Sequence, residues 1–111
     1  MVDKTIVSAV RHYLKTVDDS GIRVTFGVIF GSHARGEATG ESDIDVMVVS
    51  PTFDGKRKLD DVAQLWKCAA KANEGIEPIA CGEVQWRENE SSPIIEVARQ
   101  QGQIVRLTEE G

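Results

Sequence analysis

Residues 30–45 read FGSHARGEATGESDID, and the rest of the chain is organised around this stretch. One apolar run ends at Phe30 and a second begins after Asp45, and both are typical of buried strands. Between them, a Gly-Ser pair opens a segment of small residues that can form one or two helical turns. Two aspartates, one residue apart, close the segment. The sequence therefore predicts a strand, a turn, a short helix and a second strand.

Asp43 and Asp45 lie at the start of the second predicted strand. Side chains at positions i and i+2 of a strand leave the same face, so the two carboxylates point the same way. Two ionised carboxylates that lie close together repel each other unless a cation lies between them or one holds a proton. Because hard oxygen ligands suit magnesium, the pair predicts a site for this divalent ion.

The Gly-Ser pair predicts a phosphate-binding turn beside the aspartates. Gly31 permits a sharp turn and the close approach of a ligand. A helix that begins near Ser32 would direct free backbone N–H groups at an anion, and the Ser32 hydroxyl and the Arg35 guanidinium can donate to phosphate. Each piece also occurs in ordinary turns, but the complete spacing arises by chance in a chain of this length only about once in a thousand. The pattern therefore predicts a nucleotide–magnesium site.

The combination of Gly31-Ser32 with Asp43-x-Asp45 resembles the signature of the minimal nucleotidyltransferases, which are small members of the DNA polymerase β-like superfamily. The similarity extends over most of the chain. It implies an α/β (α+β) fold in which a small mixed β-sheet is flanked by helices, as in the palm of polymerase β. It also implies transfer of a nucleoside monophosphate from a triphosphate, with ATP as the expected substrate, to a hydroxyl group.

Glu77 lies in the apolar run 76–81, which predicts a third strand. A charge among apolar neighbours is costly unless it is paired or bound to a metal, and Pro78 indicates an edge strand. One interpretation therefore places Glu77 in solvent at that edge. The other makes it a third carboxylate beside the aspartates, and the resemblance favours this one because relatives with a third acid carry it on a strand in this region.

The remaining apolar patterns predict further elements. Helical spacing predicts helices at 2–20, 59–73 and 93–101, with Asp3 capping the first and Trp66 facing the core from the second. Runs of β-branched and aromatic residues predict strands at 22–30, 43–49, 76–81 and 103–107. Residues 83–90 read as a polar connection.

Length and composition predict one domain over residues 1–111. The net charge of −5 argues against a broad nucleic-acid-binding surface, which needs a basic face. Cys68 and Cys81 lack the spacing of a zinc site or a disulfide framework, so we expect reduced packing residues. We identify no secretory signal, and no apolar run approaches the roughly 20 residues of a membrane span, so we expect a cytoplasmic protein.

In the catalytic hypothesis, Asp43 and Asp45 hold two Mg²⁺ ions, and Glu77 helps to bind one of them and accepts the acceptor proton. Gly31 and Ser32 hold the β,γ-phosphates of the nucleotide, and Arg35 neutralises developing charge.

The acceptor has no domain of its own in this sequence, so we expect it on a partner protein or in the cleft of a homodimer. The chain resembles the antitoxin half of HEPN/MNT toxin–antitoxin modules, which implies adenylylation of a tyrosine on a HEPN-domain toxin. Two alternatives remain open. One is transfer to the hydroxyl of a small molecule, and the other is a non-catalytic module that binds nucleotide or neutralises a toxin by contact.

Overall fold

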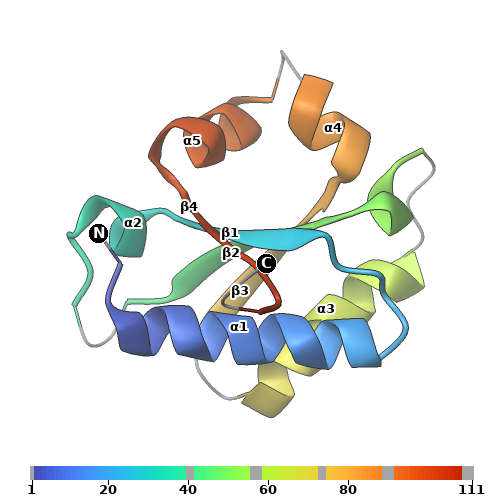
Figure 1. The fold of residues 1–111 in the computed structure, drawn as a ribbon, viewed down its shortest axis with the longest axis horizontal. Coiled ribbons are helices and arrows are strands. Elements are labelled where there is room, and N and C mark those ends of the chain that lie inside the picture. The colour runs from blue at the N-terminus through green and yellow to red at the C-terminus, as the bar shows by residue number, and fades with distance from the viewer. Residues whose placement is uncertain (1, 40–41, 56–58, 73–74, 89–91, 109–111) are drawn as a thin grey trace.

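The structure is a computed structural model that describes residues 2–39, 42–55, 59–72, 75–88 and 92–108. Four strands form one sheet in the order β3-β2-β1-β4 (Figure 1). They are β1 (Phe26–Phe30), β2 (Ile44–Ser50), β3 (Ile76–Gly82) and β4 (Gln103–Val105). β1 runs antiparallel to β2 and β4, whereas β2 and β3 are parallel. The predicted α+β fold with a small mixed sheet is confirmed.

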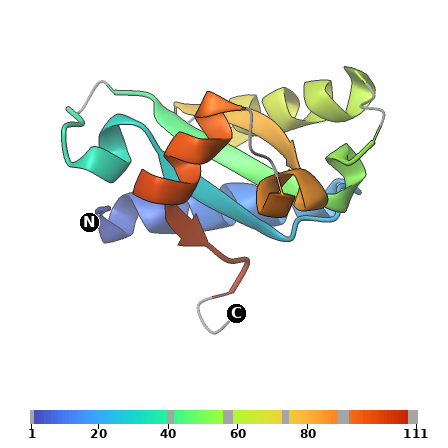
Figure 2. The same cartoon turned by 90° about the horizontal axis from the view of Figure 1, so that it is seen from above.

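Helices cover both faces of this sheet. One face carries α1 (Lys4–Asp19) and α3 (Leu59–Ala72), and the other carries α4 (Glu83–Glu88) and α5 (Pro93–Gln101) (Figure 1). The short α2 (Ser32–Arg35) follows β1, and a 3₁₀ turn, η1 (Pro51–Phe53), follows β2. Seen from above, α2 lies at one end of the sheet and α3 runs along the β3 side (Figure 2).

Two apolar cores lie above and below β2, and together they explain its continuous apolar run. Val46 and Val48 join the core under α1 and α3, whereas Met47 and Val49 join the core under α4 and α5. In the first core the buried Tyr13 hydroxyl donates a hydrogen bond to the Leu65 carbonyl oxygen at 2.9 Å. This bond joins α1 to α3, and burial raises the pKa of Tyr13 above its ordinary value.

The boundaries of most elements lie close to those expected. Asp3 caps α1 as predicted, because its carboxylate accepts a hydrogen bond from the Thr5 backbone N–H at 2.7 Å. β1 begins at Phe26 rather than at residue 22, and β4 ends at Val105 rather than at residue 107. The expected end of the second long helix, residue 73, lies outside the described residues.

Residues 83–88 form α4, so the predicted polar connection is wrong in this part. The Asp54 carboxylate accepts hydrogen bonds from the backbone N–H groups of Val84, at 3.1 Å, and Gln85, at 3.3 Å. These are free N–H groups of the first helical turn, and Asp54 satisfies them from a distant part of the chain. A local sequence pattern contains no sign of this cap.

Trp66 also departs from the prediction, because it is 50% exposed rather than part of the core. α3 packs on the sheet through Leu65, Cys68 and Ala69, and Trp66 lies beside this buried stripe. Cys68 and Cys81 are both buried free thiols, as expected. Among the described residues, no helix is long and apolar enough to cross a membrane.

Candidate functional site

Three carboxylates lie where β2 and β3 begin. Asp43 directly precedes β2, Asp45 is the second residue of β2, and Glu77 is the second residue of β3. The parallel pairing aligns Asp45 with Glu77, and the antiparallel pairing aligns Phe30 with Asp45. Since paired residues share a face of the sheet, Asp45 and Glu77 point to the same side. The structure therefore brings together the three acidic residues that the sequence singles out.

Gly75, the residue just before β3, lies close to Asp43. The Ile44 backbone N–H donates a hydrogen bond to the Gly75 carbonyl oxygen at 2.8 Å. A Cβ atom added to Gly75 would lie 3.9 Å from Asp43 Oδ1. The Asp43 carboxylate thus lies near Gly75, the residue just before β3 and two positions before Glu77.

The three carboxylates interact electrostatically. The charge of Asp43 is the main cause that raises the pKa of Glu77, followed by desolvation and the charge of Asp45. Desolvation raises the pKa of Asp45 and Asp43 adds to the effect, while hydrogen bonding with Glu77 and the nearby His33 and Arg35 lower it. Like charges held together in this way favour a shared proton or a bound cation.

Gly31 brings the turn after β1 directly against Asp45. Its φ of 76° and ψ of −149° lie in a region that is essentially restricted to glycine. A Cβ atom at this position would overlap Asp45 Oδ2 and would lie 3.2 Å from Asp45 Cγ. Glycine is therefore required at position 31 for two reasons. It permits the backbone conformation, and it leaves room for the Asp45 carboxylate.

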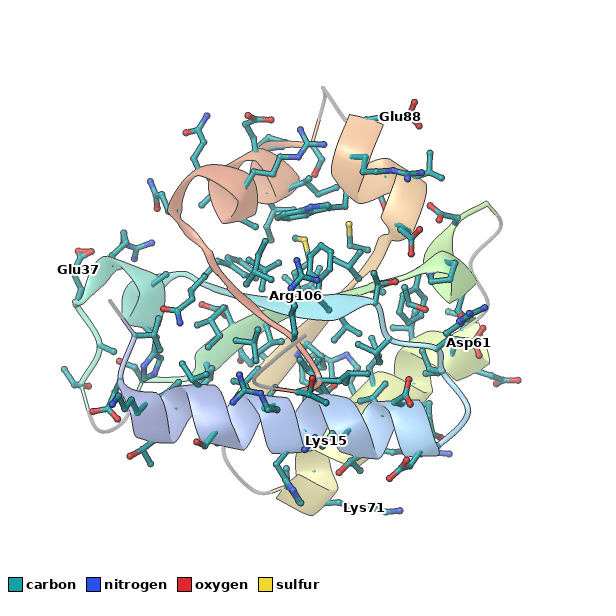
Figure 3. The ribbon with its side chains drawn as sticks, viewed as in Figure 1. Lys15, Glu37, Asp61, Lys71, Glu88 and Arg106 are labelled. Carbon is teal, nitrogen blue, oxygen red and sulfur yellow. The ribbon has the colours of Figure 1, made fainter. Side chains whose placement is uncertain are left out.

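The short helix α2 places further polar residues beside Asp45. Ser32 is its first residue, and Arg35, its last, forms an ion pair with Glu37 at 2.7 Å. This pair is exposed, and Figure 3 shows Glu37 on the outer side of α2. Exposed ion pairs contribute only about 0–1 kcal/mol, so the guanidinium can exchange Glu37 for another anion at little cost.

His33 is a site residue that the sequence analysis did not select. Its Nε2 lies 3.4 Å from the Ser42 carbonyl oxygen, so the ring joins α2 to the segment just before β2. Its charge lowers the pKa of Asp45. The only signal for this role in the sequence is its position directly after Ser32.

Among the described residues, no group of three or more Asp, Glu, His or Cys side chains is arranged to hold a metal ion. Asp43, Asp45 and Glu77 still supply the type of ligand that Mg²⁺ takes in proteins, carboxylate oxygen. Their mutual repulsion, which raises the pKa of Glu77, is relieved by a cation. The donor set therefore fits Mg²⁺, although the three side chains would have to turn toward a common ion.

Two surface pockets lie at opposite ends of β2 and β3. A pocket of about 270 Å³ is lined by residues of α3 and the start of β3: Trp66, Ala69, Ala70, Gly75 and Ile76. A pocket of about 400 Å³ lies at the other end, after β2 and β3, and is lined by Phe53, Asp54, Gly55, Val84 and Gln85. Only the first pocket shares a residue, Gly75, with the surroundings of the carboxylates.

Comparison with known proteins gives a family and two similar folds. Residues 10–104 match the family model described as "Nucleotidyltransferase domain". No curated protein matches the sequence significantly. A candidate nucleotidyltransferase from Sulfolobus solfataricus superposes with a TM-score of 0.65 and 18% identity, over 88% of this chain and 77% of that one. A toxin–antitoxin structure with AMP-PNP gives a TM-score of 0.60 and 18% identity, over 90% of this chain and 75% of that one.

Replacement of Gly31 by alanine is expected to destabilise the fold through its contact with Asp45. Gly36, at the other end of α2, provides a matched control, because its φ is 73° but nothing lies within 4 Å of an added Cβ. Gly36→Ala should cost about 1–2 kcal/mol for the left-handed conformation alone. Gly31→Ala should cost more, because an unfavourable conformation of about 1–3 kcal/mol is combined with steric overlap.

Urea denaturation of both variants, alone and combined with Asp45→Ala, measures this contact. The excess cost of Gly31→Ala over Gly36→Ala should shrink when the Asp45 carboxylate is absent. An excess that is the same in both backgrounds would show that the overlap plays no part.

Removal of the Glu77 charge is expected to stabilise the protein at neutral pH when divalent cations are chelated. Because the pKa of Glu77 is raised in the folded state, folding is favoured most below the ordinary pKa of a glutamate and loses stability as the pH rises through the raised value. Glu77→Gln removes this loss of stability. The variant should therefore become increasingly more stable than the wild-type chain as the pH rises from about 4 toward neutrality.

Denaturation midpoints measured from pH 3 to pH 8 in EDTA would reveal this dependence. Glu88→Gln is a suitable control, since Glu88 is exposed at the end of α4 (Figure 3). If Glu77→Gln and Glu88→Gln gave the same pH profile, repulsion among the three carboxylates would not affect stability.

Proposed function

Because this chain belongs to the family of nucleotidyltransferase domains, we propose that it transfers AMP from ATP to a hydroxyl group of a partner protein. The observation that carries the proposal is the placement of Asp43, Asp45 and Glu77 at the start of two neighbouring strands, with Gly31 against Asp45. We further propose that residues 1–111 act as one nucleotidyltransferase domain.

The phosphate groups of ATP would lie at the turn between β1 and α2. Gly31 has no side chain there, so an anion can approach the backbone closely. The Ser32 hydroxyl would donate to a phosphate oxygen, and the Arg35 guanidinium would leave Glu37 to neutralise negative charge. Since Asp45 is in contact with Gly31, the bound phosphates would lie next to the carboxylates.

In the transfer, the acceptor oxygen forms a bond to the α-phosphorus of ATP. The bond from that phosphorus to the oxygen bridging the α- and β-phosphates breaks, and pyrophosphate leaves. A carboxylate oxygen of Glu77 would take the acceptor proton. The pairing of Glu77 with Asp45 across β2 and β3, which places it at the carboxylate site, supports this role.

Asp43, Asp45 and Glu77 would together hold Mg²⁺, and we propose two ions. When bound, Mg²⁺ supplies positive charge to the attacking and leaving oxygens. The support for this assignment is the donor set, because three neighbouring carboxylates provide hard oxygen ligands.

We propose a protein acceptor, specifically a HEPN-domain partner that presents a tyrosine. Support comes from the similar fold that was solved as a toxin–antitoxin with AMP-PNP, together with the resemblance to minimal nucleotidyltransferases.

The test is mass spectrometry of proteins from the source cells after incubation with the purified chain, Mg²⁺ and ATP. One protein should gain the mass of AMP. Asp43→Asn should reduce this transfer at least as much as loss of a preorganised electrostatic group does, about 10²–10³-fold. Asp61→Asn serves as the control, since Asp61 lies on α3 away from α2 (Figure 3).

The possible outcomes separate the alternatives. Transfer only to a small alcohol would show that the acceptor is a small molecule and not a partner protein. Full activity of Asp43→Asn would contradict the catalytic role of the carboxylates. Nucleotide binding without transfer to any acceptor would favour a non-catalytic module.

A further inference from the structure

Asp43 differs from the other two carboxylates in how its backbone is held. Asp45 and Glu77 lie inside β2 and β3 and are paired with each other, and Asp45 is also paired with Phe30 of β1. Asp43 precedes β2 and is exposed. The strand ladder therefore fixes the backbone of Asp45 and Glu77 directly, whereas the position of Asp43 depends on the peptide groups on either side of it.

Each of these two peptide groups has a hydrogen-bonding partner from another element. The group after Asp43 carries the Ile44 N–H, which donates to the Gly75 carbonyl oxygen at 2.8 Å. The group before Asp43 carries the Ser42 carbonyl oxygen, and His33 Nε2 lies 3.4 Å from it. Because a carbonyl oxygen can only accept, Nε2 carries the proton in this contact. Asp43 is thus held between the start of β3 and the helix α2.

His33 makes this contact from a fixed position. The Arg35 N–H donates to the Gly31 carbonyl oxygen at 3.1 Å within α2, and Gly31 lies against the Asp45 carboxylate. The contact between His33 and Ser42 joins residues nine positions apart, so it ties the end of the loop after α2 back to the helix. The ring therefore connects a turn anchored at Asp45 to the residue that precedes Asp43.

The imidazole also acts on the site electrostatically. Desolvation and the charge of Asp43 raise the pKa of Asp45, and the charge of His33 partly opposes this rise. The ring is thus close enough to both aspartates to influence how a cation is bound.

We propose that His33 is a positioning residue for Asp43. Its Nε2–H holds the Ser42 carbonyl oxygen and so fixes the peptide group through which the Asp43 carboxylate is presented to Mg²⁺. The inference rests on the proposed function, because only a metal-binding carboxylate requires a fixed position. Hydrogen bonds that orient the ligands of a metal ion typically contribute about 10–100-fold to its affinity.

Two amide side chains separate the two nitrogens of the ring. The amide nitrogen of glutamine is as many bonds from the backbone as Nε2, whereas that of asparagine corresponds to Nδ1. His33→Gln should therefore keep the bond to Ser42, and His33→Asn and His33→Ala should lose it. His12→Ala is the matched control, because His12 is the only other histidine of the chain and is exposed on α1.

The first measurement needs no metal ion. In EDTA, amide hydrogen exchange followed by NMR reports the Ile44 N–H, which belongs to the peptide group on the other side of Asp43. Its exchange should be about fivefold faster in His33→Ala and His33→Asn, as after loss of one ordinary hydrogen bond, and unchanged in His33→Gln and His12→Ala. Equal exchange in His33→Ala and the wild-type chain would overturn the positioning role.

The second measurement is the affinity for Mn²⁺, used as a paramagnetic probe of the Mg²⁺ site and followed by electron paramagnetic resonance. His33→Ala and His33→Asn should bind Mn²⁺ about 10–100-fold more weakly, and His33→Gln and His12→Ala should bind it like the wild-type chain. A role in folding alone would lower the stability of His33→Ala and leave the Mn²⁺ affinity of the folded chain unchanged.

Three results of the second measurement would overturn the proposal. One is an unchanged affinity in His33→Ala. Another is retention by His33→Asn with loss in His33→Gln, which would assign the effect to Nδ1. The third is a coupling of the bound Mn²⁺ to an imidazole nitrogen, which would make His33 a metal ligand. A wild-type chain that binds no Mn²⁺ would count against the proposed function, and hydrogen exchange would still decide whether His33 holds the backbone at Asp43.

Discussion

The contact between Gly31 and the carboxylate of Asp45 is the constraint on which the arrangement of the site depends. The antiparallel pairing of β1 with β2 aligns Phe30 with Asp45, so the residue after Phe30 must turn within reach of that carboxylate. A residue with a side chain would collide with it, and the backbone conformation at Gly31 would be unfavourable as well. Glycine removes both obstacles, and as a result the backbone after β1 and the acidic residues of β2 form one continuous surface.

The fold tolerates the electrostatic repulsion among the three carboxylates because its stability comes from the two apolar cores. From Val46 onward, β2 is buried on both faces, and its side chains alternate between the two apolar cores. Asp43 and Asp45 lie at the open end of the same strand, before this buried stretch begins. Their charges therefore act on Glu77 without disturbing the packing of the cores.

Much of the site was predictable because its residues are close in sequence or lie in strands that must pair. The spacing of Asp43 and Asp45 places them on one face, and Gly31 marks the turn. Glu77 required one more step, the parallel pairing of two apolar strands, which aligns it with Asp45. The exposure of Trp66 was not predictable, since helical periodicity indicates a stripe of the helix but not how far the sheet extends beneath it. Here β3 is the edge strand, so one side of α3 has no neighbouring strand to cover it.

A comparison of two aspartates explains why the carboxylates at one end of the sheet are available for a ligand. Asp54 and Asp45 lie at opposite ends of β2, and each occupies the space beside a glycine, Gly82 and Gly31 respectively. The oxygens of Asp54 accept hydrogen bonds from two backbone N–H groups of α4, so the fold itself uses this carboxylate to cap a helix. The hydrogen bonding of Asp45 involves Glu77, another acid, and such a pair can share a proton but cannot remain bonded once both groups are ionised. A bound cation would therefore relieve more repulsion at the end of β2 that carries Asp45 than at the end that carries Asp54.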